Sequence, residues 1–483
     1  RANIVNADGK EFGEFTEGVF RFRPDGSEVQ KISSRGGNTW GVGFTWDGEL
    51  LWSQATSGRH LFHTVVPEWA MDRGQLGDTW TYSVPIDEYI PLHPAMRDER
   101  PAYVQVAPTG GFTAGIGATP YTGGTWPEPF ASSVFVSEPT LWLTHRDVLE
   151  RDGATYSARV GRAETEFLAA TDLWFCPVGH RVGPDGALYL LDFYNQAVSH
   201  NDIRLDRQMH GPNNQAIRPD RARRFGRLWR IDHRAAEPWD RPRLHEAAAE
   251  ELVEALAHPN RWQRMTAQRL LVEEGRAEAA GALREVLESA DRPTRARLHA
   301  LWTLEHLDLL SDGTLAEAIT EGPSALRRNG LRVINDRHVS GEEIAPTLRQ
   351  AALSELDDQD PRVRIEALIA LGSMGGDAGT IDRVLQRYPE LENDWARSGA
   401  VAVFNQRPEL ALRRLVATGD TATYGGAASS VAERLAEERT AEQVEALRRD
   451  LAATVGASSS GEGSGPWEAV LGELAKEEES SEE

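Results

Sequence analysis

Hydrophobic and polar residues alternate around Asp-Gly pairs in the first half of the chain. The pattern occurs in residues 18–29, 39–54 and 180–194. An Asp-Gly pair between alternating runs favours a hairpin, because both turn positions can adopt positive φ. Three hairpins of one pattern, followed by the strand-like stretch 226–232, predict the blades of a β-propeller within residues 1–236.

After residue 241 the apolar residues recur at i, i+3, i+4 and i+7, which is the period of an amphipathic helix. Stretches of this kind are 244–275, 276–307, 346–376, 395–419 and 427–455. Helix pairs that recur every 30 to 45 residues or so are typical of HEAT-like repeats. The predicted fold is therefore a multidomain β + α protein, with an N-terminal β-propeller and an all-α HEAT-like solenoid over 241–456.

The C-terminal end changes composition once more. Residues 456–467 are rich in Gly and Ser, as in a flexible linker. A short helical stretch and an acidic end follow, so residues 457–483 are predicted to be a linker, a short helix and an acidic tail. The tail is expected to be disordered or to form a capping helix. The alternative is that Trp467, Val470, Leu471 and Leu474 dock onto a partner or onto the end of the solenoid.

Charge excludes one class of function. Asp and Glu number 75 against 52 Lys and Arg, which gives a formal net charge of −23. Nucleic-acid binding needs clustered basic residues, so it is not expected. No run of 18 apolar residues is present, so no membrane span is expected. The chain starts at Arg1 without a methionine, which favours a processed, exported product with an extracytoplasmic location.

Cys176 is the single cysteine of the chain. One cysteine excludes an internal disulfide framework, a C-x-x-C redox pair and a multi-cysteine zinc site. Because Trp, Phe and Pro flank it, we expect Cys176 to be a buried, unreactive thiol.

Candidate chemistry gathers around the hairpin of residues 180–194, since propellers bind ligands at strand ends near the central channel. No Walker, G-x-S-x-G or dinucleotide motif stands in a credible context. The catalytic candidates are Asp192, His200 and Arg227, and the cofactor-binding candidates are Tyr194, Asn195 and Arg230. The sequence assigns no metal ligands.

The amino-acid sequences of several stretches resemble those of a known family. They are "TEFLAATDLWFCPVGHRVGPDGALYLLDFYNQAVSH", "GRHLFHTVVPEWAMDRG", "FTAGIGATPYTGGTWPEPF" and "LAHPNRWQRMTAQRLLVEEG". They are similar to bacterial glucose/sorbosone dehydrogenase-like propellers followed by HEAT repeats, a family described as membrane-bound dehydrogenases. The resemblance covers roughly residues 1–450. It implies an exported protein, and for active relatives a pyrroloquinoline quinone cofactor with calcium, sugar or alcohol oxidation, and often a C-terminal cytochrome c domain.

The departures from that family matter for function. Residues 174–179 correspond to a stretch that in this family is usually Trp-Phe-Arg-Pro-Val-Asp/Asn. Here Cys176 replaces the arginine, and Gly179 replaces the polar residue at the end. The cysteines that the family often has in its Gly-rich strand do not occur in residues 114–118. The given sequence also contains no cytochrome c segment. Six blades would need more than 236 residues, so either there are fewer blades or the others lie upstream or on another chain.

These losses favour a non-catalytic interaction or scaffold protein that meets protein partners through the HEAT surface or the acidic tail, with no cofactor. One alternative is a quinone-dependent sugar or alcohol dehydrogenase, an assignment that would rest on fold analogy alone. A further alternative is a carbohydrate-binding propeller in which Trp69, Trp80 and Trp126 stack on sugar rings.

Overall fold

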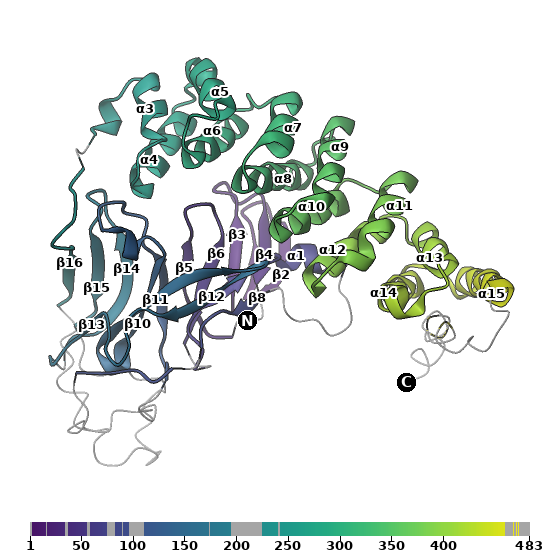
Figure 1. Ribbon diagram of the computed structural model, residues 1–483, viewed down its shortest axis with the longest axis horizontal. Coiled ribbons are helices and arrows are strands. Elements are labelled where there is room, and N and C mark those ends of the chain that lie inside the picture. Colours follow the sequence, from purple (N-terminus) through teal and green to yellow (C-terminus); the bar gives the residue numbers. More distant parts are fainter. Residues whose placement is uncertain are drawn as a thin grey trace, which may run out of the picture. The chain divides into compact units, whose positions relative to one another are not determined.

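The computed structural model describes residues 2–15, 17–33, 37–55, 58–74, 83–88, 90–95, 111–172, 174–194, 225–239 and 242–458, together with Trp467, Val470 and Gly472. The chain forms two compact units. Unit 1 comprises Arg1–Val65 and Ser83–Leu309, and unit 2 comprises Val66–Tyr82 and Leu310–Glu483. Apart from the short α1 (Glu68–Met71) and single 3-10 turns, strands precede helices along the chain, as the sequence predicts (Figure 1). The compact units, however, do not divide at this change of secondary structure.

The strands of unit 1 form five small antiparallel sheets, none of which closes on itself within the described residues. Two of them are two-stranded: β1 (Ala2–Val5) with β2 (Glu11–Phe15), and β3 (Val19–Phe22) with β4 (Val29–Ser33). The third has the order β5 (Thr39–Phe44), β6 (Leu50–Gln54), β7 (Phe62–Thr64), β8 (Ser83–Pro85). The fourth has the order β12 (Thr155–Val160), β11 (Leu143–Asp152), β10 (Ser133–Glu138), β9 (Ile116–Pro120), with β13 (Leu168–Ala169) also paired to β11. The fifth has the order β14 (Pro177–Val182), β15 (Leu188–Asp192), β16 (Arg227–Ile231).

The three predicted Asp-Gly hairpins are confirmed. They are β3–β4, β5–β6 and β14–β15, each antiparallel. The turn glycines Gly26, Gly48 and Gly186 all have positive φ, between 74° and 88°. This is the conformation that favours glycine at a hairpin turn, and it explains why the sequence signal succeeds here.

The first helices belong to unit 1, and the start of α4 bonds directly to a turn between two strands. They are α3 (Ala249–Ala255), α4 (Arg261–Glu273), α5 (Ala280–Glu288) and α6 (Thr294–His306). At the start of α4, Asn260 Nδ2 donates to the Gly183 carbonyl at 2.9 Å, and Gln263 Nε2 donates to the Pro184 carbonyl at 3.0 Å. These bonds tie the helix to the β14–β15 turn.

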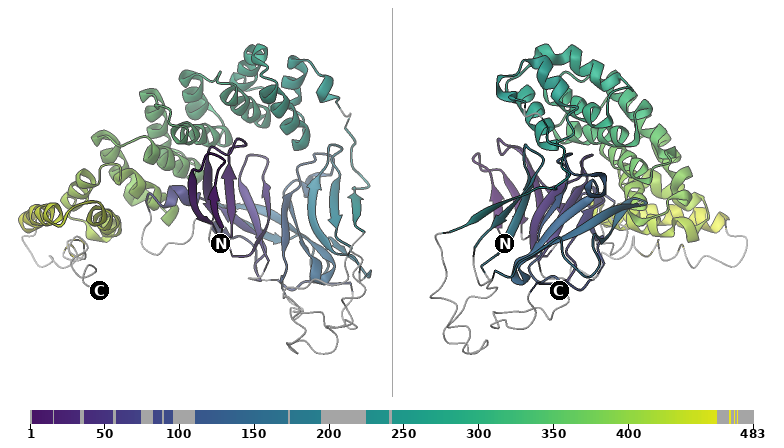
Figure 2. Two further views of the ribbon diagram at one scale, coloured as in Figure 1. Left: turned by 180° about the vertical axis from the view of Figure 1, so that it is seen from behind. Right: turned by 60° about the vertical axis from the view of Figure 1, so that its left-hand side comes forward.

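Unit 2 is an array of helices in two rows (Figure 2). One row is α8 (Ser324–Val339), α10 (Pro361–Ser373), α12 (Asp394–Phe404) and α14 (Thr421–Glu438). The other is α7 (Asp312–Glu321), α9 (Pro346–Ser354), α11 (Ala378–Arg387), α13 (Pro408–Ala417) and α15 (Ala441–Ser458). Two rows of successive helices are compatible with a HEAT-like solenoid.

A short segment from the strand-rich half of the sequence is part of unit 2. Helix α1 (Glu68–Met71) packs against α12, and just after it Arg73 Nη1 donates to Ser373 Oγ at 2.7 Å. The Asn405 side chain donates to the Arg73 carbonyl at 2.8 Å. Residues from within the predicted propeller region, 1–236, therefore stabilise the helical unit. Among the described residues, no helix has the length and apolar character needed to cross a membrane.

Candidate functional site

The carboxylate of Asp192, at the end of β15, is buried and accepts hydrogen bonds from the protein itself. It accepts from the backbone N–H groups of Cys176 and Tyr194, both at 2.9 Å. It also accepts from Arg227 Nε at 2.6 Å and Trp229 Nε1 at 2.9 Å. Asp192 therefore fixes the ends of three strand segments to one another.

Arg227 and Tyr194 lie next to each other beside Asp192. The Arg227 guanidinium lies 4.4 Å from the Tyr194 ring centroid, and Arg227 Nη1 donates to Asp172 at 2.7 Å. Burial alone would raise the pKa of Asp172, but the bond from Arg227 lowers it below its usual value. Tyr194 adopts φ of 51°, and its ring stacks on Trp174. Asn195 and His200 lie outside the described residues.

Arg230 is at the opposite end of the same sheet. Its guanidinium pairs with Asp185 and Asp232, both at 2.8 Å. It therefore supports the β14–β15 turn and does not join Asp192 and Arg227.

These residues are a poor match for an anionic quinone. Such a ligand is held by guanidinium groups that offer spare charge and donors. Arg227 and Arg230 are each already neutralised by two carboxylates. Cys176 is 2% exposed, and burial together with nearby Asp192 and Glu138 raises the pKa of its thiol to about 12. The thiol is therefore protonated and closed to solvent.

Of the aromatic residues proposed for sugar stacking, Trp126 does not lie on an open face. Trp126 is buried, its ring stacks on Tyr121 at 4.4 Å, and its Nε1 donates to Asp232 at 3.1 Å. Trp69 belongs to α1 in unit 2, and the Arg73 guanidinium lies 5.1 Å from its ring. Trp80 lies outside the described residues. The structure therefore argues against sugar stacking at Trp126.

A buried cluster of imidazoles and carboxylates, not foreseen from the sequence, lies between two sheets of unit 1. His60, just before β7, has Nδ1 2.9 Å from Asp87 and Nε2 2.6 Å from Asp147 Oδ2. His145 on β11 has Nε2 3.3 Å from the other oxygen of Asp147 and Nδ1 2.6 Å from Glu166. All five side chains are at most 5% exposed.

Attraction between the imidazoles and the carboxylates of this buried cluster stabilises the charged form of both. Burial alone would lower the pKa of His145, but Asp147 and Glu166 raise it to about 10. The pKa of His60 is raised in the same way by Asp147 and Asp87. Burial would raise the pKa of Asp147, yet the two imidazoles hold it well below its usual value. His60, His145 and Asp147 also offer ligand atoms that all lie within 4.8 Å of one another, which is close enough to hold one metal ion.

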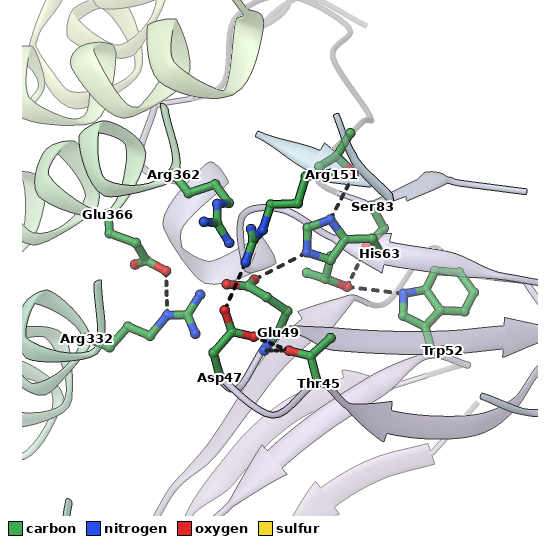
Figure 3. A network of polar contacts seen from close by, with 12 residues as sticks. Thr45, Asp47, Glu49, Trp52, His63, Ser83, Arg151, Arg332, Arg362 and Glu366 are labelled. Carbon is green, nitrogen blue, oxygen red and sulfur yellow. Dashed lines mark hydrogen bonds and ion pairs between the residues drawn. The ribbon is translucent and has the colours of Figure 1, made fainter. Parts of the chain in front are cut away.

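A second polar network lies on the β5–β8 sheet, and Figure 3 shows it from close by. His63 Nε2 is 3.3 Å from Glu49, and His63 Nδ1 is 2.9 Å from Thr155. Asp47 accepts from Thr45 at 2.6 Å and pairs with Arg151 at 3.1 Å. These contacts join the β5–β6 turn to the β11–β12 hairpin and satisfy the buried polar groups there.

Part of the buried cluster has a sequence signal that the hairpin and helix patterns do not include. In "LTHRD", His145 and Asp147 are two residues apart, so on a strand they point to the same face. Strand β11 keeps both on the side that meets His60. Asp87 and Glu166 carry no comparable signal, because they lie in connecting segments far away in the sequence.

Comparison with known proteins identifies no activity. The profile of a family described as "Domain of unknown function (DUF7133)" matches residues 2–235, which is the strand-rich part of the chain. No curated protein matches. Among similar solved structures is the crystal structure of an engineered protein, Northeast Structural Genomics Consortium target OR329. It is 16% identical, with 47% of this chain and 96% of that chain covered, and its TM-score of 0.22 is too low to support an argument about fold.

Proposed function

We propose that this chain is a non-catalytic, extracytoplasmic interaction protein. The observation that carries the proposal is the bonding of Asp192. The residue expected to serve as a catalytic carboxylate is buried and accepts four hydrogen bonds from Cys176, Tyr194, Arg227 and Trp229. A general base needs a lone pair directed at substrate, whereas this carboxylate is saturated by its own fold.

We further propose that the small sheets are blades of an incomplete propeller. Neighbouring sheets approach face to face, as at Gly41 of β5 against Gly117 of β9 and at Gly117 against His180 of β14. Repeated small antiparallel sheets packed on their faces are the building plan of propellers. Together with a HEAT-like array, they would provide rigid and concave surfaces suited to protein binding.

The partner that best fits the chain is a protein with a basic surface. A net charge of −23 attracts basic partners and accelerates their association, and salt should weaken that association. On α4 the side chains of Trp262 and Met265 are 43% and 40% exposed and share one helix face. Trp and Met are residue types typical of the centre of an interface.

Two measurements test the proposal. First, the purified protein is titrated with pyrroloquinoline quinone and calcium, and dye reduction is followed with a panel of sugars and alcohols. We expect no cofactor uptake and no turnover. Uptake of about one cofactor per chain, with turnover that is lost in Asp192→Asn, would support the dehydrogenase instead.

Second, a photoreactive phenylalanine analogue replaces Trp262 in the native host. Replacement of Phe22, which is 68% exposed on β3, is the matched control. We expect a defined cross-linked protein from position 262, with a yield that falls as salt rises. Equal labelling at both positions, or none at either, would contradict an interaction surface on the helices.

A further inference from the structure

We propose that His60, His145 and Asp147 bind one divalent first-row transition metal ion, with zinc as the expected ion, and that this ion fastens the β5–β8 sheet to the β9–β13 sheet. The site goes beyond the proposed function and does not depend on it. Its ligands come from the segment before β7 and from β11, so residues about 85 positions apart would share one ion.

The orientation of the imidazoles carries the inference. The Nε2 atoms of His60 and His145 both face Asp147, at 2.6 and 3.3 Å from its two oxygens. Each Nδ1 atom faces a carboxylate of its own, Asp87 at 2.9 Å and Glu166 at 2.6 Å. Metal-binding histidines typically present one nitrogen to the ion while a carboxylate holds the other. The five residues therefore match an inner and an outer ligand shell.

One buried nitrogen supports this inference. His145 Nε2 has no hydrogen bond of good geometry, although the ring is almost completely buried. A buried polar atom without a partner is costly, and its presence calls for an explanation. An ion between His145 Nε2 and Asp147 would give this atom a partner.

The charge of the group is compatible with a doubly charged ion. Asp87, Asp147 and Glu166 contribute three negative charges, and Arg59, which lies 3.3 Å from Asp87, contributes one positive charge. Without an ion, protons on His60 and His145 balance the remaining two negative charges. A divalent ion that displaces both protons would keep the group balanced, so metal binding would leave no unbalanced buried charge.

The donor atoms select the kind of metal. Two imidazole nitrogens and one carboxylate oxygen suit zinc and its neighbours in the first transition row. Calcium and magnesium prefer shells of oxygen, which these residues do not supply. Because the ligands are buried and span two sheets, the ion would act as a structural cross-link.

The first experiment is elemental analysis of the full-length protein, purified without chelators or a metal-affinity step. We expect about one zinc per chain. Cobalt reconstitution of the chelated protein should then give visible ligand-field bands, and removal of the ion should lower the thermal midpoint. Absence of metal after purification, together with no cobalt or zinc uptake by the apo protein, would overturn the proposal.

Variants locate the ion. Asp147→Asn removes a direct ligand and should weaken zinc binding by more than about 100-fold. Glu166→Gln changes the outer shell and should weaken zinc binding by about 10- to 100-fold. His299→Gln is the matched control, since His299 is a buried imidazole of α6 that bonds to the amide of Gln268. It should keep full zinc content. Circular dichroism establishes that each variant is folded, and full zinc content in folded Asp147→Asn would place the ion elsewhere and refute the assignment.

Discussion

Gly41 of β5 lies directly against Gly117 of β9. A Cβ atom placed on Gly41 would be 2.5 Å from the Gly117 Cα atom, closer than real Cβ atoms approach backbone. Its neighbour Gly43 is equally restricted, because a Cβ there would lie 1.8 Å from the Ala118 carbonyl oxygen. The glycines thus allow two sheets of unit 1 to approach through their backbones.

Gly41→Val should therefore destabilise unit 1. The added side chain must push β5 away from β9, and overpacking of this kind typically costs about 1–3 kcal/mol or more. Chemical denaturation measures the loss of unfolding free energy. Gly281→Ala on α5 is the control, because a Cβ there meets nothing within 4 Å, and it should be neutral or slightly stabilising. Similar midpoints for the two variants would contradict the close approach.

Asp192→Ala should lower stability by about 3 kcal/mol or more. The substitution removes the acceptor for Arg227 and Trp229 and for two backbone N–H groups, and loss of one partner of a buried ion pair is strongly destabilising. Thermal unfolding measures the effect. Asp185→Asn, at the partly exposed turn, should cost less. Wild-type stability in Asp192→Ala would show that the carboxylate is reserved for another role.

Gly74→Val should release helix α1 from unit 2. A Cβ on Gly74 would lie 2.0 Å from the Ser398 carbonyl oxygen, so the variant cannot keep this packing. Limited proteolysis should then cut the 66–82 segment faster, and unit 2 should unfold at a lower temperature. Gly426→Ala, on α14 of the same unit, controls for a glycine substitution, because a Cβ there meets nothing within 4 Å and its φ is not positive. Unchanged proteolysis would indicate that the segment does not support the helical unit.

Acid should weaken unit 1 partly through His180. Burial, followed by the charge of Arg181, lowers the pKa of His180 from 6.5 to about 3. The unfolded chain therefore binds a proton that the folded chain refuses between these two values. Unfolding free energy should fall as pH drops from 6.5 towards 3, by up to about 1.4 kcal/mol per pH unit.

Urea denaturation across this range tests the effect by comparing wild type with His180→Gln. The variant keeps a polar side chain near Ser137, which lies 2.9 Å from His180 Nε2. It should take up about one proton fewer on unfolding. Identical pH dependence in the two proteins would rule out His180 as the responsible group.

The sequence by itself determined the local structure. Asp-Gly pairs between alternating residues specified hairpins because only a few residue types accept positive φ, and Gly26, Gly48 and Gly186 do so. The same signal at Asp152-Gly153 forms the β11–β12 hairpin, which is not among the three predicted hairpins. Helical periodicity and the Asp360-Pro361 start of α10 were equally local, since Asp360 accepts from the Arg362 N–H within one turn.

Only the tertiary structure decided which polar residues meet. Asp192 and Arg227 stand 35 residues apart, and their pairing depends on β15 lying beside β16. His60 and Asp147 stand 87 residues apart and meet because β7 and β11 belong to neighbouring sheets. Local preferences act over a few residues, whereas burial of charge is settled by every segment that packs around it. For this reason the sequence pattern indicated the end of the β14–β15 hairpin and gave no indication of the buried cluster of imidazoles and carboxylates.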